Sequence, residues 1–148
     1  MGGVDGGSRR KPIEPEVETR FERSEVLTVH VPLLESTRGL IDATALARLR
    51  PGALVVNAAR GGIIEEAALM DALDSAHLGG VVLDVFEDEP LPASSPLVAW
   101  AQRHADRVLL TPHIAGVTPE ASQVLFVRAW SNVRAVLTEG SEPRHRLR

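Results

Sequence analysis

Short runs of apolar, mostly β-branched residues alternate along this chain with stretches in which apolar residues recur every three or four positions. The apolar runs occupy residues 26–31, 53–56, 80–85 and 108–110, and the helical stretches occupy residues 43–49, 65–73, 96–103 and 119–137. Short runs of this kind indicate buried strands, and each is followed by a helical stretch. The pattern therefore predicts an α/β fold, a parallel sheet with helices on both of its faces.

Capping and helix-breaking residues mark the ends of several elements. Asp42 is a suitable N-cap for the helix expected from residue 43, and Pro51 with the glycine after it ends that helix. Thr118 followed by Pro119 is a preferred helix start. Residues 1–15 are rich in Gly, Pro and charge and show no apolar period. We therefore expect a disordered leader over residues 1–15 and one domain over residues 16–148.

Composition narrows the classes of function. The chain has 148 residues and no cysteine, which excludes a cysteine nucleophile, a disulfide scaffold and a thiolate zinc site. Its net charge is -4, and its basic residues are scattered rather than clustered, which argues against nucleic acid as a partner. No apolar stretch approaches the roughly 20 residues that cross a bilayer. We expect a small molecule as the partner, with no metal and no membrane.

Charged and polar residues directly follow three of the predicted strands. Arg60 comes after the second strand, an acidic cluster with Glu89 after the third, and His113 after the fourth. Because ligands of open parallel sheets bind at the carboxyl ends of the strands, these side chains are expected around one cleft. An arginine suits a carboxylate through two parallel hydrogen bonds, and a histidine exchanges a proton near neutral pH.

Each of these residues also has a purely structural interpretation. Arg60 can be a surface arginine at a glycine-rich turn, and His113 can be a structural histidine. Glu89 is a candidate partner for a ring nitrogen of His113, and such a contact would fix the tautomer of the ring. Asp84, at the end of a buried strand, can cap a neighbouring loop or hold a ligand amide.

Four sequence segments stand together in this chain: VHVPL with TRGLI, GALVVNAARGG, LDVFEDEP and TPHIAG. In this order and at this approximate spacing, over about residues 20–144, they resemble the D-isomer-specific 2-hydroxyacid dehydrogenases, the family of phosphoglycerate, glyoxylate, lactate and formate dehydrogenases. The resemblance implies a partial, Rossmann-like NAD-binding domain. The combination of segments is far more specific than any one of them.

The resemblance implies an NAD(P)-dependent enzyme that oxidises the CH-OH group of a D-2-hydroxy acid, or reduces the 2-keto acid in reverse. It implies that Arg60 binds the substrate carboxylate, that His113 exchanges the proton, and that Glu89 is the partner of His113. The implied cofactor is NAD or NADP, and the implied cofactor-binding residues are His30, Pro32, Thr37, Ala58, Ala59, Arg60, Asp84, His113 and Gly116. A cytoplasmic location and a homo-oligomer, or a partner chain, are expected with it.

The family's Gly-x-Gly-x-x-Gly loop has no counterpart at any of the 12 glycines. The resemblance therefore covers an NAD-binding domain without its first βαβ unit, as in a truncated chain. We expect an uncovered edge or face of the sheet where that unit would pack, and little turnover from this chain alone.

Two other functions fit part of the pattern. A non-catalytic dinucleotide-binding or dimerisation module, as in corepressor members of the family, is compatible with it, because such members can retain Arg60, Glu89 and His113. A phosphoacceptor receiver domain shares the alternation of strands and helices. It requires a lysine at a strand end, however, and the only lysine is Lys11.

Overall fold

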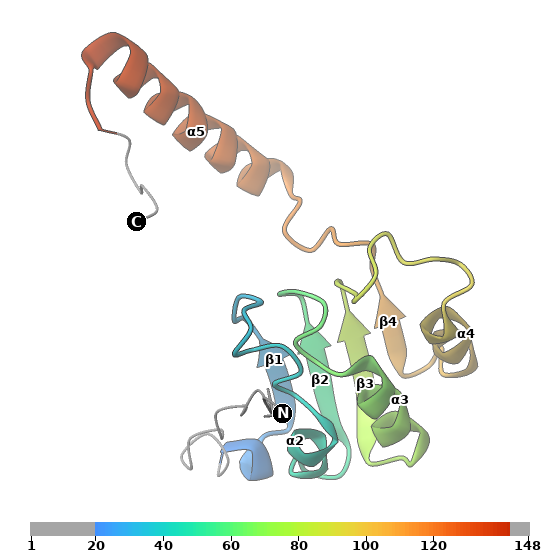
Figure 1. Ribbon diagram of the computed structural model, residues 1–148. Helices are drawn as coiled ribbons and strands as arrows, with labels where there is room; N and C mark the ends of the chain where they lie inside the picture. The colour runs from blue at the N-terminus through green and yellow to red at the C-terminus, as the bar shows by residue number, and fades with distance from the viewer. Residues whose placement is uncertain (1–19, 143–148) are drawn as a thin grey trace, which may run out of the picture. The chain divides into compact units, whose positions relative to one another are not determined.

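The computed structural model describes residues 20–142, which divide into two compact units, one ending at His113 and the other beginning at Ile114. The first unit contains a sheet of four parallel strands, β1 (Val26–Val29), β2 (Ala53–Asn57), β3 (Leu78–Leu83) and β4 (Val108–Leu110). They lie in the order β1-β2-β3-β4 (Figure 1). The predicted α/β class and parallel sheet are confirmed, whereas the leader expected at residues 1–15 lies outside the described residues.

Three helices connect these strands, α2 (Ala43–Ala47), α3 (Glu66–Asp74) and α4 (Pro96–Arg103). The predicted cap of α2 is present, because the side chain of Asp42 accepts the Ala45 N–H at 2.9 Å. All three helices start within one residue of their predicted positions. Strand β3 begins earlier than expected, at Leu78, because Leu78 already pairs with Ala53 of β2.

One apolar core joins the three helices to the sheet. Its buried side chains come from one face of the strands and from the inner faces of the helices, and include Val29, Leu46, Val55, Leu69, Leu73, Val81, Leu83, Leu97 and Trp100. Neighbouring helices also contact each other, α2 with α3 and α3 with α4. Hence all three helices lie on the same face of the sheet. Full burial of such side chains stabilises the fold by about 1.5–3 kcal/mol each.

The expectation of helices on both faces is corrected within this unit. The strand order advances in one direction, and parallel connections are right-handed as a rule, so successive connecting helices fall on the same face. The opposite face is open: Leu54 of β2 and Leu109 of β4 are 45% and 55% exposed. Val26 of β1, which pairs with Leu54, is exposed beside it. The uncovered apolar face expected from the sequence is therefore present among residues 20–113.

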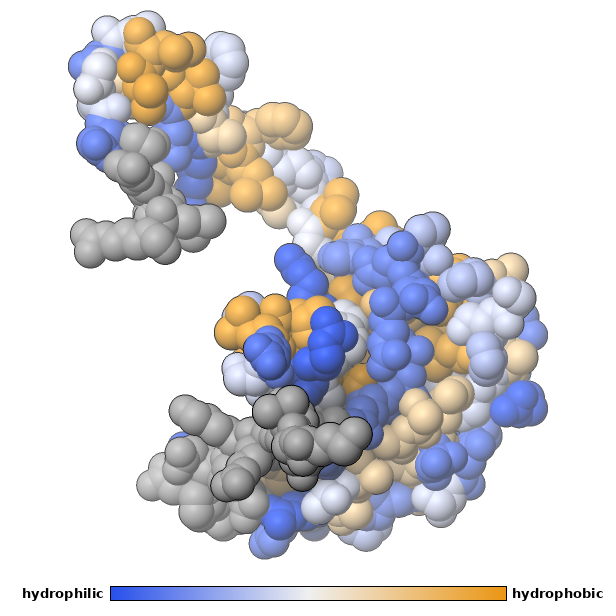
Figure 2. All heavy atoms as spheres, viewed as in Figure 1, coloured by the Kyte–Doolittle hydropathy of each residue, from blue (hydrophilic) through white to orange (hydrophobic). Residues whose placement is uncertain are grey.

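The second unit consists mainly of α5 (Pro119–Glu139). Thr118 caps this helix by accepting the Ala121 N–H at 3.1 Å, and Gly140 ends it with a φ of 61°. No residue of α5 is buried, and Figure 2 shows apolar side chains along it; the most exposed are Leu125, Phe126, Trp130 and Leu137. None of the helices within residues 20–142 is long and apolar enough to cross a membrane.

Candidate functional site

Three loops leave the sheet at the carboxyl ends of β2, β3 and β4, whose arrowheads point the same way in Figure 1. These loops carry Arg60, Glu89 and His113, the three residues predicted to share a cleft. Loops that follow neighbouring parallel strands lie side by side. Hydrogen bonds from His113 and from the Phe86 N–H lower the pKa of Glu89, and the positive charge of Arg60 lowers it further.

The side chains of Glu89 and His113 are in direct contact. Nδ1 of His113 lies 2.7 Å from Oε2 of Glu89. This hydrogen bond, followed by one from the Phe86 N–H, holds the pKa of Glu89 below its ordinary value. An ionised carboxylate in this position keeps the proton on Nδ1 of the ring. Nε2 is then the nitrogen of His113 that this contact leaves available to a ligand.

The backbone of His113 adopts the left-handed region, with a φ of 54°. A non-glycine residue held there costs on the order of 1–3 kcal/mol, and such residues cluster at functional sites. The N–H of His113 donates to the Thr111 carbonyl at 3.0 Å, which tightens the turn after β4. The sequence at this turn therefore fixes the histidine in an unusual conformation next to its carboxylate partner.

Asn57, the buried last residue of β2, holds the loop that presents Arg60. Its side chain accepts the Ala59 N–H at 3.1 Å and donates to the Arg60 carbonyl at 2.9 Å. The exposed guanidinium of Arg60 donates to the Ala59 carbonyl at 2.6 Å. A guanidinium has five N–H donors, so this one bond is compatible with a two-point contact to a ligand carboxylate.

Gly61 allows the Arg60 loop to touch the loop after β3. A Cβ atom at Gly61 would lie 1.7 Å from the Phe86 carbonyl oxygen, a distance that no side chain tolerates. The N–H of the same Phe86 donates to Oε1 of Glu89 at 3.0 Å. Close backbone packing therefore links the loops after β2 and β3, and the Glu89 carboxylate braces the second loop from within.

Asp84 is a buried carboxylate, 3% exposed, at the end of β3. Its Oδ1 accepts a short hydrogen bond from the Thr111 hydroxyl, which ties the ends of β3 and β4 together. Burial of a charge is costly unless it is hydrogen-bonded, and this bond meets part of that need. Asp84 thus bonds a neighbouring segment, one of the two roles left open by the sequence, and its role toward a ligand stays a prediction.

A cleft of about 630 Å³ lies on the Arg60 side of the sheet edge. Its lining contains five of the predicted cofactor-binding residues, His30, Pro32, Ala58, Ala59 and Arg60. Thr37 acts on the same cleft indirectly, because its hydroxyl donates to the Pro32 carbonyl at 2.7 Å and shapes the loop that lines it. Gly116, another predicted cofactor-binding residue, belongs to the second unit.

A second hollow, of about 610 Å³, adjoins the Glu89 and His113 pair. Its other walls are mostly apolar and consist of Phe86, Pro90, Leu91, Val98, Leu110, Thr111 and Pro112. The hollow therefore offers an apolar surface beside the hydrogen-bonded pair. The sequence did not predict this hollow, since its residues come from a loop, α4 and β4.

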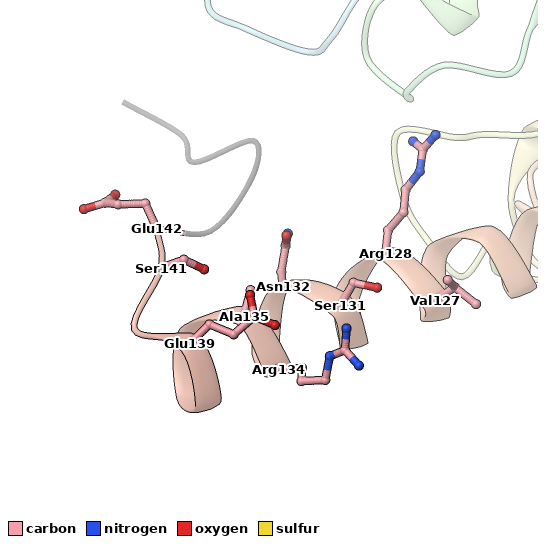
Figure 3. Close-up of a pocket in the computed structure, with 9 residues that line it drawn as sticks. All are labelled: Val127, Arg128, Ser131, Asn132, Arg134, Ala135, Glu139, Ser141 and Glu142. Carbon is pink, nitrogen blue, oxygen red and sulfur yellow. The ribbon is translucent and has the colours of Figure 1, made fainter.

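A hollow of about 480 Å³ also lies along the C-terminal half of α5 (Figure 3). Figure 3 shows Arg128 and Arg134 pointing in different directions, with Glu139 beyond Arg134 toward the end of the helix. Because the two guanidinium groups do not converge on one point, they do not form an anion site. Within the described part of the chain, no group of His, Asp and Glu side chains is arranged to hold a metal ion.

Sequence reasoning missed the residues that support the site. Asn57 had a detectable signal, a polar residue at the end of a buried strand, and Gly61 had only its place in a glycine pair. Glu66 of α3, which accepts the Glu87 N–H at 2.8 Å, had no signal, because only the folded chain brings α3 to the loop after β3.

Known proteins resemble this chain over most of its length. Residues 8–115 match the family described as D-isomer specific 2-hydroxyacid dehydrogenase, NAD binding domain. The (S)-sulfolactate dehydrogenase of Chromohalobacter salexigens is 47% identical over 119 residues, which are 80% of this chain and 37% of that protein. The glyoxylate reductase of Thermofilum pendens is 39% identical over 122 residues, 82% of this chain and 34% of that protein. The chain thus spans about a third of these relatives.

Solved structures give the same result for the fold. A D-isomer specific 2-hydroxyacid dehydrogenase from Xanthobacter autotrophicus, in complex with NADPH and MES, superposes with a TM-score of 0.70 at 41% identity, over 85% of this chain and 48% of its own. A D-lactate dehydrogenase from a Sporolactobacillus species superposes with a TM-score of 0.78 at 33% identity, over 88% of this chain and 41% of its own. The parallel sheet of this chain therefore matches about half or less of each of these larger structures.

Proposed function

Because the chain belongs to the D-isomer specific 2-hydroxyacid dehydrogenase family, we propose that its described residues form the proton-transfer and carboxylate-binding part of an NAD(P)-dependent oxidoreductase site. The reaction is oxidation of the CH-OH group of a D-2-hydroxy acid, or reduction of the 2-keto acid in reverse. The observation that carries this proposal is the 2.7 Å contact between His113 and Glu89, at the sheet edge that also presents Arg60.

Each of the three side chains has a distinct task. Arg60 binds the substrate carboxylate through two parallel hydrogen bonds. His113 moves a proton between its Nε2 atom and the oxygen on C2 of the substrate. Glu89 holds the Nδ1 proton and stabilises the imidazolium that forms during the reaction. The lowered pKa of Glu89 supports this task, because the carboxylate then stays ionised at neutral pH.

The residues present fit part of a nicotinamide dinucleotide. A bound NAD or NADP supplies the hydride donor or acceptor for C2. The cleft lined by His30, Ala58 and Ala59 lies beside Arg60, and buried Asp84 is a suitable acceptor for the carboxamide N–H groups. No Gly-x-Gly-x-x-Gly loop for the pyrophosphate occurs in the 148 residues. These residues therefore suit the nicotinamide end of the cofactor.

We expect little turnover from these 148 residues alone. Positioning of the reactants supplies about 7–11 kcal/mol of barrier reduction in well-oriented reactions, and a weakly held cofactor forfeits it. The direct test is an assay of NADH and NADPH oxidation with glyoxylate, pyruvate and hydroxypyruvate, with a His113→Ala variant alongside. Turnover that disappears in the variant would contradict the expected inactivity and would at the same time support the reaction.

A chimera tests the site independently of the activity of the isolated chain. Residues 20–113 replace the corresponding segment of the (S)-sulfolactate dehydrogenase, whose remaining sequence supplies the rest of the fold. We expect turnover in the chimera, a loss of roughly 100- to 10,000-fold with His113→Ala, and a raised KM with Arg60→Ala. The matched control is His104→Asn, which replaces a histidine outside the proposed site, at the C-cap of α4. A folded, cofactor-binding chimera whose turnover ignores His113→Ala would overturn the proposal.

The open face of the sheet favours a second function, association with another copy of the chain. Val26 and Leu54 expose adjacent apolar surface there, and Leu109 of β4 is exposed as well. Exposed apolar faces of this kind mark interaction sites. Such association is compatible with the oxidoreductase and also with a non-catalytic dimerisation module. The chimera separates the two, because only the oxidoreductase depends on His113.

A further inference from the structure

The segment at residues 84–89 delivers Glu89 to His113, and contacts from its own unit hold it in place. Gly61 packs directly against the Phe86 carbonyl, and the Phe86 N–H binds Glu89 itself. A further contact comes from Glu66, the first residue of α3. Oε1 of Glu66 accepts the backbone N–H of Glu87 at 2.8 Å.

Glu66 occupies an electrostatically unfavourable position. It is partly buried, and its carboxyl group faces the acidic side chains of Glu87 and Asp88. Burial raises the pKa of Glu66 and these two charges raise it further, against the lowering effect of the Glu87 N–H. An acid placed against two others destabilises the loop that it touches, unless its hydrogen bond contributes more. The hydrogen bond from the Glu87 N–H is therefore the favourable interaction that offsets the unfavourable placement of the Glu66 carboxyl group.

We propose that Glu66 is a positioning residue for the proton-transfer pair: from α3 it anchors the 84–89 segment so that Glu89 reaches His113. The proposal rests on the proposed function for the meaning of the pair, whereas the anchoring itself is measured without turnover. The position requires a side chain long enough to place an acceptor oxygen at the Glu87 N–H, and it requires no charge, because that N–H belongs to a neutral amide. A glutamine meets that requirement, an alanine has no acceptor, and an aspartate is one methylene too short.

The pKa of Glu89 reports its position, since the hydrogen bond from His113 is the largest cause of its lowered value. The charge of Glu66 is not among the causes of the lowered pKa of Glu89, so its removal alone should leave that pKa nearly unchanged. Release of the segment should raise the pKa, because Glu89 then loses the bond to His113. A raised pKa therefore reports the loss of the anchor and not the loss of the charge.

The experiment is an NMR titration of the Glu89 carboxyl carbon in the wild-type chain and in Glu66→Ala, Glu66→Asp and Glu66→Gln. Asp71→Ala is the matched control, since Asp71 is an exposed acid on the same helix. We expect the alanine and aspartate variants to raise the pKa of Glu89 toward its ordinary value, because the bond to His113 is then lost. The glutamine variant should leave the pKa at the wild-type value, and the control should leave it unchanged.

In the chimera, the alanine variant should lower kcat and the glutamine variant should restore it, with KM unchanged because Arg60 is untouched. A pKa of Glu89 that stays constant in Glu66→Ala, or that rises equally in Glu66→Gln, overturns the anchoring. If Glu66→Ala does not fold, the aspartate and glutamine variants carry the test. Turnover insensitive to His113→Ala would overturn the proposed function and leave the titration result standing, so the two failures are distinguishable.

Discussion

The two faces of the sheet differ sharply, although the same strands build both. On the helix-covered face Val55 of β2 is 0% exposed, whereas on the other face its neighbour Leu54 is 45% exposed. Both residues are aliphatic, so residue type does not explain the difference. The cause is the one-way strand order, which places α2, α3 and α4 on a single side.

The covered face also supports the site. Helix α3 packs under the sheet, and its first residue, Glu66, bonds the segment that carries Glu89. Changes on the covered face should therefore alter stability and the site together. Changes on the open face should alter association and leave the site intact.

The largest expected effect is from truncation of a buried leucine on the covered face. Leu69 of α3 is 0% exposed, and Leu69→Ala should lower the free energy of unfolding by about 2–5 kcal/mol. Leu54→Ala on the open face should lower it by about 1 kcal/mol or less, because half of the side chain is already in water. Urea unfolding of the two variants at low protein concentration checks the contrast. Equal losses would mean that the open face is packed in solution.

The next largest effect is expected when a side chain is added at Gly61, where the two loops are in close contact. A Cβ atom there meets the Phe86 carbonyl, so Gly61→Ala should separate the two loops and lower the free energy of unfolding by about 1–3 kcal/mol. The pKa of Glu89 should rise toward its ordinary value as the contact with His113 loosens. Gly116→Ala is the stability control, because a Cβ there meets nothing within 4 Å. A Gly61→Ala variant with wild-type stability would contradict the close approach.

These effects separate what the sequence can predict from what it cannot. The strands and the edge shared by Arg60, Glu89 and His113 were predictable, since apolar runs and loop positions are local features. The side on which the helices lie depends on the order and handedness of connections between distant strands. The supports at Gly61 and Glu66 depend on approaches between loops and a helix that are far apart in the chain. The local sequence pattern therefore predicts neither the side of the sheet on which the helices lie nor these supporting contacts.

A smaller effect is expected on the open face, where association rather than folding changes. The wild-type chain should self-associate at tens of micromolar through this surface. Replacement of both Leu54 and Leu109 by lysine should raise the dissociation constant at least tenfold, about 1.4 kcal/mol, because charge is costly in an apolar interface. Sedimentation velocity over a concentration series measures this change. A wild-type chain that sediments as a stable monomer at these concentrations would contradict the association.

The smallest effect concerns two acids of α3 on the covered face. The Trp100 N–H, with help from His104, lowers the pKa of Asp74. A carboxylate with a lowered folded-state pKa contributes stability above its ordinary value of 3.8, and this contribution is lost as the pH falls through the folded-state pKa. Burial raises the pKa of Glu66, so its contribution has the opposite sign and weakens as the pH rises through 4.5.

Asp74→Asn should therefore flatten the loss of stability below about pH 4, and Glu66→Gln should flatten a loss between about pH 4.5 and the raised pKa. Urea midpoints measured from pH 3 to pH 7 report both slopes. An Asp74→Asn variant with the wild-type slope below pH 4 would show that the bond to Trp100 does not favour the ionised acid. A shift of both slopes in the same direction would contradict the opposite environments of the two carboxyl groups. Those environments differ because one end of α3 faces the donors of α4 and the other faces the acidic loop that carries Glu89.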